Sequence, residues 1–483
     1  MKKINNLLAL LLAAVLTFSS CAQSTTATIV TEGTKESTGA TTAASKTTAA
    51  TKKPSSGDID EDMNFRGETF TFAILTDYES LTGYGICEVE NETEHMNESI
   101  KERNEYIYDA FNGKTETVKM SAAALNGALE AGNCEVDFVY APYGAVNTKY
   151  CYDTASLGVD FTKPWLAGVA SKIGFGGKSY AIAGCFLLET YDSMEVILFN
   201  KDVKAKANSL KKDDFYQYVY DGEWTVDKLF ALSKLAYSEA EVSGFVSERN
   251  GVSSLYFAAG QSFISATENG GETVFANGFN SAAKSITDKI VSAFGDPSAK
   301  IVERNDILNT LVTGKTLFAK ATLGDMKKIY DMNEAYKNYG EYEDFEDFIC
   351  CGILPLPYGE KNQGFITCAS EGTPFIFALK SGASPEYMKD YLWYFAYFSY
   401  TTIYKDYLNL RKYLYTTDTD SSTMVDYIMK SLTYDEARSY GWAEAEEKYI
   451  SAVLSGENPV EKFRTDLYPS LESAAKEYIK NLE

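Results

Sequence analysis

The sequence predicts an α/β protein with more than one domain, and three observations lead to this prediction. Predicted strands at 67–75, 116–119 and 136–141 alternate with predicted helices at 97–111 and 122–131. Such alternation is typical of a parallel or mixed sheet with helices packed on it. The chain has 483 residues, which is too long for one ordinary domain. Hydrophobic residues make up 45% of it, enough to build large cores without metals or disulfides.

The first predicted strand and the first predicted helix have clear periodic signals. The segment 67–75 (GETFTFAIL) alternates apolar and polar residues and contains β-formers, as a strand does. In the helix at 97–111, Ile100, Ile107 and Phe111 recur at helical spacing. Both segments therefore present one apolar side to a core.

The remaining elements are predicted from capping residues and short apolar runs. Thr225 is the expected N-cap of a helix whose apolar face begins at Leu229. A long tyrosine-rich helix is expected from Pro385 to Leu414, with the proline in its first turn. Further strands are expected at 191–199, 316–320 and 348–357, a hairpin at 174–182 and a last helix at 469–482.

The N-terminus has the pattern of an export signal. Met1–Lys3 is positively charged, and Leu7–Phe18 is an apolar run without charge that is too short for a comfortable membrane span. The sequence Phe18-Ser19-Ser20-Cys21 that follows resembles a lipobox, although Phe18 stands where leucine is usual. This resemblance implies that residues 1–20 are a signal peptide and that Cys21 is lipidated. An ordinary secreted protein cleaved nearby is the alternative.

The segment that follows is expected to be a tether. Residues 24–57 are almost entirely Ser, Thr, Ala, Gly and Lys and show no apolar periodicity. A flexible chain of this length spans roughly 30–35 Å. Residues 21–57 are therefore interpreted as a lipidated cysteine with a disordered spacer, and the protein is expected to be held at the membrane by lipid alone.

Charge and cysteine content exclude several classes of partner and site. The net charge is -23, and because the first 57 residues carry six lysines and two glutamates, the rest carries -27. Such a body repels nucleic acid, although the charge also serves solubility. His95 is the single histidine and lies in a polar stretch, so no metal site or cofactor is expected. The seven cysteines after Cys21 form no C-x-x-C pair and are expected to be buried free thiols.

Seven stretches, in this order along the chain, resemble one known family. They are NESIKERNEYIYDAF (97–111), DFVYAP (137–142), DFTKPWL (160–166), GKSYAIAGC (177–185), LFNKD (198–202), YVYDGEWTVDKL (218–229) and GILPLPYGEKNQ (352–363). The family is the extracellular solute-binding lipoproteins of ABC sugar importers, family 1-like, in a branch common among Gram-positive anaerobes. Leu166 and Cys185 depart from its pattern, where a tryptophan and an aspartate are usual.

This resemblance implies a fold and its domain boundaries. The fold is the type II periplasmic-binding-protein fold, in which two α/β domains are joined by hinge strands and close over ligand. By analogy the chain crosses between the domains near 189–196, 318–323 and 371–375. Lobe I is then expected to comprise 58–190 and 322–372, and lobe II 191–321 and 373–483.

The ligand is expected to contact loops that follow strands, because ligands in such folds bind at the carboxyl ends of strands. A sugar needs an aromatic plane against its C–H face and carboxylates or amides at its rim. The loops at 76–80 and 140–143 offer both, whereas Trp224 and Trp393 are expected to be packing residues. The expected ligand-binding residues are Asp77, Tyr78, Glu79, Tyr140, Tyr143, Trp165, Glu189, Asp192 and Trp442.

The function that the resemblance implies is capture of a small solute, by default a carbohydrate, and its delivery to ABC permease subunits. The protein is expected to act as a monomer on the extracellular face of the cell membrane and not to be an enzyme. A surface sensor or adhesin with the same fold is one alternative. A surface glycosidase is another, because carboxylates alone can hydrolyse glycosides. An oligosaccharide, a monosaccharide and a peptide all remain possible ligands.

Overall fold

The computed structural model describes residues 59–482 except 61, 79–80, 91, 167–173, 176–177, 270–271, 340–349 and 371. The expected signal peptide, lipidated Cys21 and tether lie outside the described residues, and so does Glu79. Among the helices that are described, none has both the length and the apolar character needed to cross a bilayer.

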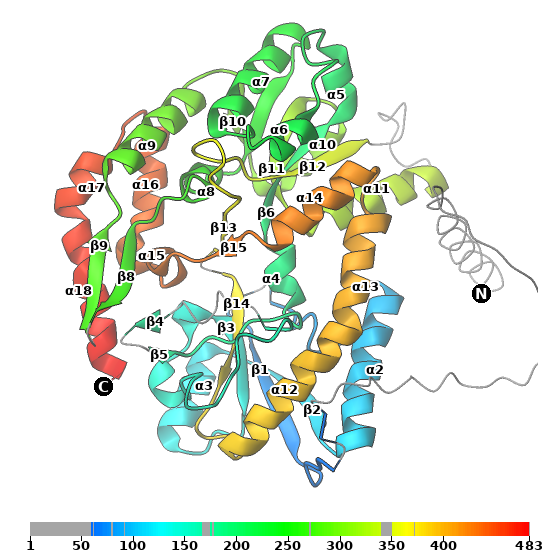
Figure 1. Cartoon of the computed structure of the whole chain (residues 1–483), viewed down its shortest axis with the longest axis vertical. Helices are drawn as coiled ribbons and strands as arrows, with labels where there is room; N and C mark the ends of the chain where they lie inside the picture. Colours follow the sequence, from blue (N-terminus) through cyan, green and yellow to red (C-terminus); the bar gives the residue numbers. More distant parts are fainter. Residues whose placement is uncertain are drawn as a thin grey trace, which may run out of the picture. The chain divides into compact units, whose positions relative to one another are not determined.

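The first lobe is built on a four-stranded sheet with the strand order β14-β3-β1-β2 (Figure 1). β1 is parallel to β2 and β3, whereas β14 arrives from far along the sequence and is antiparallel to β3. Every residue of β3 is buried, which is typical of a strand covered on both faces. The strands are β1 Thr69–Leu75, β2 Lys114–Met120, β3 Phe138–Pro142 and β14 Pro374–Ala378.

Helix α12 packs on this sheet through aromatic rings. Its Tyr391 stacks on Phe70 of β1 with ring centroids 3.9 Å apart. Pro385 stands at its start as expected, but the helix ends before Leu414 because Thr402 has a φ of -124° and a ψ of -85°. The helices of this part are α2 Glu94–Phe111, α3 Ala122–Ala131, α12 Pro385–Thr401, α13 Ile403–Asn409 and a π-helical turn, η4, Leu410–Leu414.

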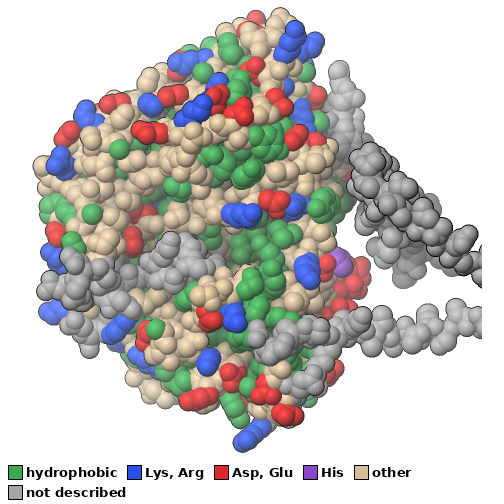
Figure 2. Space-filling view, in the orientation of Figure 1, with side chains coloured by type: hydrophobic (Ala, Val, Ile, Leu, Met, Phe, Trp, Pro, Cys, Tyr) green, Lys and Arg blue, Asp and Glu red, His purple; other side chains and the backbone are tan. Residues whose placement is uncertain are grey.

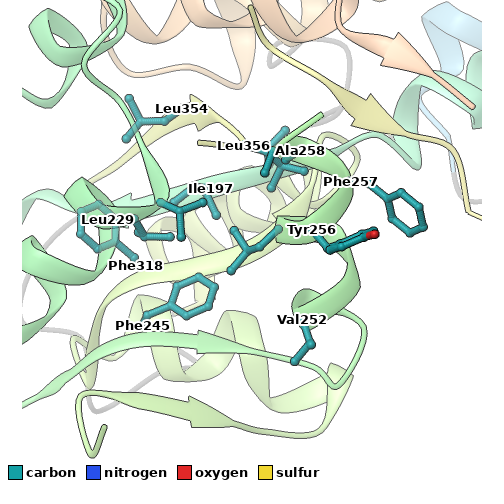
Figure 3. Packing of buried hydrophobic residues seen from close by; sticks show 14 of the residues in the cluster. Ile197, Leu229, Phe245, Val252, Tyr256, Phe257, Ala258, Phe318, Leu354 and Leu356 are labelled. Carbon is teal, nitrogen blue, oxygen red and sulfur yellow. The ribbon is translucent and has the colours of Figure 1, made fainter. Parts of the chain in front are cut away.

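The second lobe is built on a five-stranded sheet with the order β10-β7-β11-β6-β12. Its buried core brings Phe245, Ile197 and Phe318 from three neighbouring strands together with Leu229 and Tyr256 from two helices (Figure 3). The strands are β6 Glu195–Asn200, β7 Ser243–Ser247, β10 Ala299–Ile301, β11 Thr316–Thr322 and β12 Cys351–Pro355. The helices are α5 Lys201–Lys206, α6 Phe215–Tyr220, α7 Val226–Glu239, α8 Gly251–Ala258, α9 Ser281–Phe294, α10 Arg304–Val312, α11 Asp325–Tyr339 and α14 Thr419–Met429.

The C-terminal segment packs mainly on the second lobe. Tyr449 of α16 is hydrogen-bonded to Thr287 of α9 over 2.9 Å, and α18 lies beside the hairpin β8–β9 (Figure 1). This segment comprises β15 Leu432–Thr433, α15 Glu436–Ser439, a 3-10 turn, η5, Trp442–Glu444, α16 Ala445–Leu454, α17 Val460–Asp466 and α18 Tyr468–Leu482. The hairpin is β8 Ile264–Asn269 and β9 Glu272–Asn277, and the short strands are β4 Gly174–Phe175, β5 Lys178–Ser179 and β13 Thr367–Cys368.

Several local predictions are confirmed. Thr225 caps α7 by accepting a hydrogen bond from the backbone N–H of Lys228. Trp224 is fully buried, and its indole N–H donates to the carbonyl of Pro355 over 2.8 Å, so it is a packing residue. β4 and β5 pair antiparallel, as the hairpin prediction requires. The seven described cysteines are free, although Cys87, Cys350 and Cys351 are only partly buried.

The expected lobe boundaries are wrong at two strands. β12 pairs with β6 in the second sheet, although 322–372 was expected in lobe I. β14 pairs with β3 in the first sheet, although 373–483 was expected in lobe II. The chain crosses between the lobes after α4 (Leu188–Asp192), between β12 and β14, and again through α13. The crossing expected near 318–323 is wrong because α11 and β12 continue the second lobe.

The expected strand at 191–199 is also only partly correct. Residues up to Asp192 belong to the short helix α4, and the strand β6 begins at Glu195. The turn between them is closed by Ser193, whose backbone N–H donates to the carbonyl of Glu189 over 2.9 Å. A segment predicted as one strand thus divides at the lobe crossing into a helical turn and a strand.

Two glycines give a matched test of this packing. A Cβ on Gly352 of β12 would lie 2.3 Å from the Phe199 ring, whereas one on the exposed Gly127 of α3 would meet no atom within 4 Å. We expect Gly352→Ala to lower the free energy of unfolding by about 1–3 kcal/mol through overpacking. Gly127→Ala should raise it by about 0.5–1 kcal/mol, because alanine loses less backbone entropy in a helix. Urea unfolding curves measure both, and a stabilised Gly352→Ala variant would contradict the packing described for β12.

Candidate functional site

The strands of both sheets end at the junction of the two lobes. The end of β11 reaches the linker between α4 and β6, where the backbone N–H of Leu323 donates to the carbonyl of Met194 over 2.9 Å. The end of β3 reaches the C-terminal segment through Tyr143. Loops that follow strands, which carry binding residues in α/β folds, therefore meet here. Hydrophobic side chains gather across the middle of one face of the molecule, and charged side chains are spread over the rest of that face (Figure 2).

Four aromatic side chains form a stack at this junction. Tyr440 and Trp442 lie parallel, with ring centroids 4.7 Å apart and an interplanar angle of 10°. Tyr143 meets Tyr440 edge-on at 4.7 Å, and Tyr478 of α18 lies 4.8 Å from Tyr440. Trp442 is half-buried, whereas Tyr143 is only 1% exposed. The stack thus presents part of the Trp442 ring to solvent, supported from behind by tyrosines.

The backbone around Trp442 is strained. Ala443 and Glu444 have φ values of 53° and 52°, in the left-handed region that is unfavourable for residues other than glycine. Gly441, with a φ of 65°, adopts the same region without that cost. Strain of this kind costs of order 1–3 kcal/mol per residue and is found preferentially at functional sites.

Glu189 is occupied by hydrogen bonds within the chain. Its carboxylate accepts from the hydroxyl of Tyr140, from the hydroxyl of Thr82 and from the backbone N–H of Thr82 at 2.6 Å. Burial raises the pKa of Glu189, while the bonds from Thr82 and Tyr140 act in the opposite direction. Tyr140 is itself fully buried. This pair therefore ties the loop after β1 to α4.

Asp192 is occupied in a similar way. One of its carboxylate oxygens accepts from the Tyr407 hydroxyl at 2.7 Å and from the Nε and Nη2 of Arg411 at 3.0 and 2.6 Å. Tyr407 and Arg411 are buried and lie on α13 and η4, the segment that returns the chain to the second lobe. Asp192 thus fastens one lobe crossing to another.

The other predicted residues are dispersed. Asp77 is exposed and accepts a hydrogen bond from the backbone N–H of Ala122 at 2.5 Å, which stabilises the start of α3. Tyr78 is half-buried in the loop after β1. Trp165 is 6% exposed and packs edge-on against Trp393 of α12 at 5.3 Å. Of the predicted residues, the structure brings only Tyr143 and Trp442 into the aromatic stack.

Sequence reasoning missed a buried ionic network in the second lobe. Lys320 of β11 is 2% exposed, and its ammonium group lies 2.7 Å from Glu195 and 2.9 Å from Glu248. Arg438 of α15 is 1% exposed and lies 3.0 Å from Glu446 and 3.8 Å from Glu195. Burial acts to raise the pKa of Glu195, but the two cations outweigh it and hold this pKa below its ordinary value. A lysine inside the apolar strand TLFAKAT was the one signal in the sequence.

The network determines where the C-terminal segment lies. Arg438 also donates to the carbonyl of Cys368 over 2.7 Å, and Ser253 of α8 donates to Glu446 over 2.6 Å. These bonds join β6, β11, α8, β13 and α15 to α16. The segment that carries Tyr440 and Trp442 is therefore held to the second lobe on both sides of the aromatic stack.

Two neighbouring acids in this segment have raised pKa values. Asp435 accepts from the backbone N–H groups of Arg438 and Phe263, both at 2.9 Å, and burial raises its pKa to about 6. Burial also raises the pKa of Glu436 to about 8, with the charge of Asp435 adding to the effect. Asp435 caps α15, whereas the carboxyl group of Glu436 accepts only from its own backbone N–H and pairs with no other residue of the described part of the chain.

Within the described residues, no three His, Cys, Asp or Glu side chains are grouped so as to hold a metal ion. A cavity of about 430 Å³ does occur in the second lobe, between α11, β12 and η4. None of the predicted ligand-binding residues lines it.

Comparisons with known proteins identify the fold. No family model and no curated protein matches the chain. Among solved structures, the galacto-N-biose/lacto-N-biose I-binding protein of an ABC transporter from Bifidobacterium longum is 12% identical, with a TM-score of 0.54, and the match covers 86% of this chain and 99% of that one. A cyclic α-maltosyl-1,6-maltose binding protein from Arthrobacter globiformis is 10% identical, with a TM-score of 0.51, and covers 86% and 98%.

A family 1 extracellular solute-binding protein from Bifidobacterium longum subsp. infantis is 11% identical, with a TM-score of 0.50, and the match covers 86% of this chain and 98% of that one. The matches extend over nearly the whole length of each neighbour, so they include both lobes. The expected fold is therefore confirmed, and the chain has the two-lobed α/β fold of the extracellular solute-binding proteins of ABC importers.

The buried network should be essential for stability. Lys320→Met leaves Glu195 and Glu248 without their shared cation, and we expect it to lower the free energy of unfolding by about 3–5 kcal/mol. The matched control is Lys289→Met, which breaks an exposed pair with Asp227 and should change it by less than about 1 kcal/mol. Chemical denaturation measures both. Equal effects would show that the buried network is no more important than a surface pair.

Proposed function

We propose that this chain is the extracellular substrate-binding protein of an ABC importer and that it captures a carbohydrate between its lobes. The observation that carries the proposal is the partly exposed Trp442 ring, stacked on Tyr440 where the two lobes of a solute-binding fold meet. Flat aromatic rings with a polar rim suit the C–H faces and hydroxyl edges of sugars. Structural neighbours that are described as binding lacto-N-biose and a cyclic maltose derivative support this substrate class.

We assign residues to the ligand according to whether their side chains keep accessible surface or are already engaged by contacts within the protein. Trp442 and the loop residues Asp77 and Tyr78 retain accessible surface, so we assign them to the ligand. Tyr143 supports the stack from the first lobe. We assign Tyr140, Glu189 and Asp192 to the hinge and Trp165 to packing, because their polar or ring contacts are made within the protein.

Binding without turnover is favoured over glycoside hydrolysis. Glycosidases use two carboxyl groups on either side of the scissile bond. Of the neighbouring acids Asp435 and Glu436, Asp435 has both oxygens engaged by backbone N–H groups, so only Glu436 has a carboxyl group available. Neighbours with this fold that are described as binding proteins of transporters support the same view.

We also propose that the mature protein is a monomer tethered to the outer face of the cell membrane through lipidated Cys21. The lipobox-like Ser19-Ser20-Cys21 and the Ser/Thr-rich spacer up to residue 57 support this. A flexible spacer would allow the binding lobes to reach the permease subunits that receive the solute.

The anchor has its own test. Cys21→Ser removes the thiol that would be lipidated, so we expect the variant to appear in the culture medium, whereas the unchanged protein stays with the membrane fraction. Immunoblots of the two fractions measure this. Cys87→Ser, at a partly buried free thiol, is the control and should leave the protein on the membrane. Lipid anchoring at Cys21 would be contradicted if the unchanged protein were released together with the Cys21→Ser variant, or if the Cys21→Ser variant stayed with the membrane.

Ligand capture is tested by thermal unfolding of the mature chain that carries Cys21→Ser. A panel of neutral sugars, amino sugars, oligosaccharides and short peptides is added to it. A ligand at 100 times its dissociation constant stabilises the native state by about 2.7 kcal/mol, which raises the melting temperature measurably. We expect a shift with one class of sugar, and Trp442→Ala should weaken binding of that sugar at least tenfold, about 1.4 kcal/mol.

Tyr413→Ala is the matched control, because Tyr413 is 70% exposed on η4, away from the stack. It should bind the sugar with unchanged affinity. A shift with peptides alone would overturn the carbohydrate proposal while leaving the fold, and no shift with any compound would contradict solute capture.

A further inference from the structure

Helix α15 has one side in the second lobe and the other toward the first. Ala437 is 2% exposed and belongs to the core of the second lobe, and Arg438 belongs to its ionic network. Residues three apart share one face of a helix, so Glu436 and Ser439 lie together on the remaining side. The first lobe is close there, since a Cβ placed on Gly144 would lie 3.5 Å from the carbonyl oxygen of Ser439.

Polar groups in this short segment lack partners. The Ser439 hydroxyl is buried and makes no hydrogen bond, although the residue is only 2% exposed. The hydroxyl of Tyr434, whose ring lies 5.1 Å from Phe375 of the first lobe, is buried without a partner as well. A buried unpaired polar group costs about 1–3 kcal/mol. Both residues lie close to Glu436 in the sequence, so this short segment carries several polar groups that a bound molecule can pair with.

The charge balance around Glu436 points to the kind of molecule. The buried cations of this region, Lys320 and Arg438, are already bound to Glu195, Glu248 and Glu446. No cation of the described chain pairs with Glu436, and its neighbour Asp435 is also acidic. Glu436 is half-buried, and burial together with the charge of Asp435 raises its pKa to about 8, so in the free protein this carboxyl group keeps its proton near neutral pH.

We propose that the captured solute carries a protonated amine, as an amino sugar does, and that the Glu436 carboxylate binds this ammonium group. The Ser439 and Tyr434 hydroxyls then bind neighbouring hydroxyl groups of the same solute. The inference rests on the proposed function and specifies its substrate class. A neutral sugar would meet a protonated, uncharged Glu436, whereas an ammonium group supplies the positive charge that this side of α15 lacks.

Binding of the amine is coupled to release of a proton. The ammonium group favours the ionised carboxylate, so the proton of Glu436 passes to solvent when the complex forms. Affinity for the amine should therefore increase with pH only up to the point at which the sugar ammonium itself begins to lose its proton, and it should fall above that point. Other titratable or charged groups lie on the elements packed around Glu436. Those of its own segment are Asp435, Arg438, Tyr434 and Tyr440. Those of other elements are Glu446 of α16, Cys368 of β13, Lys320 of β11, Glu195 of β6, Tyr143 of the first lobe and Tyr478 of α18.

These groups do not produce the same pH dependence. Burial raises the pKa of the surrounding tyrosines and of Cys368 above 10, so they stay neutral across this range. Lys320, Arg438, Glu195 and Glu446 are held as ion pairs. The pKa of Asp435 is raised to about 6, and its oxygens face backbone N–H groups rather than a ligand.

The test compares two disaccharides that differ only in their amines. The di-glucosamine with free amines and its N,N′-diacetylated form are titrated at pH 7 into the mature chain that carries Cys21→Ser. We expect the free amine to bind at least tenfold more tightly and to release protons, seen as a heat of binding that depends on the buffer. In Glu436→Gln the free amine should bind at least tenfold more weakly, while the acetylated form changes less than twofold.

Two further variants keep the test decisive. Glu444→Gln, at a carboxylate 83% exposed in the same segment, should leave both affinities unchanged. Glu436→Asp keeps the charge and should retain part of the preference for the amine. Folding of Glu436→Gln is checked by urea unfolding. Because the pKa of Glu436 is raised on folding, the unchanged protein should lose stability as the pH rises from 5 to 8, and the variant should lose less.

The outcomes separate this inference from the function on which it rests. Equal affinity for the two disaccharides, or a preference that survives in Glu436→Gln, overturns the amine and leaves carbohydrate capture intact. Binding of neutral sugars but of neither amino sugar in the panel also overturns it. If no sugar binds at all, solute capture itself fails and the amine fails with it.

Discussion

The structure of the candidate site depends on one buried cation. Lys320 stands in a strand that is otherwise apolar, and removing an ammonium group from water costs several kcal/mol unless carboxylates compensate it. Glu195 at the start of β6 and Glu248 after β7 supply that compensation, and Glu195 in turn approaches Arg438 of α15. Four segments that are distant in the sequence must therefore converge at one point. Because they converge at the lobe junction, the position of the C-terminal segment is set relative to the end of the second sheet.

The two sides of the aromatic stack are consequently held by different forces. On the side of the second lobe, the segment is held by charged hydrogen bonds from Arg438, which are directional and buried. On the side of the first lobe, the described contacts are ring against ring, Tyr143 with Tyr440 and Phe375 with Tyr434, together with one uncharged hydrogen bond between the hydroxyls of Thr148 and Tyr478 at 2.9 Å. Ring contacts tolerate small shifts better than ion pairs do. We therefore regard the stack and α15 as part of the second lobe, which presents them to a solute held against the first.

Local features could be predicted from the sequence, and long-range pairings could not. The caps of α3 and α7, Ser121 and Thr225, act within four residues, so their signals are local. The sheet that β12 joins is decided by pairing with β6, about 150 residues earlier, and nothing within CGILP records it. The same limit applies to the site. Glu189 and Asp192 were placed near a lobe crossing correctly, but their partners Tyr140 and Arg411 lie 49 and 219 residues away, and these partners decide that both acids hold the hinge.

Glu436 differs from the other acids of the junction in what surrounds it. In so acidic a chain a carboxylate near a cleft is no signal, and Glu195, Glu248 and Glu446 each have a cation of the protein beside them. Asp435 has two backbone N–H groups instead. Glu436 is half-buried next to Asp435 and has no cation and no N–H group of another described residue as a partner, and the residues that follow Trp442 are strained in the same segment. A positive charge that arrives with the solute explains the burial, the missing partner and the position beside the aromatic stack together.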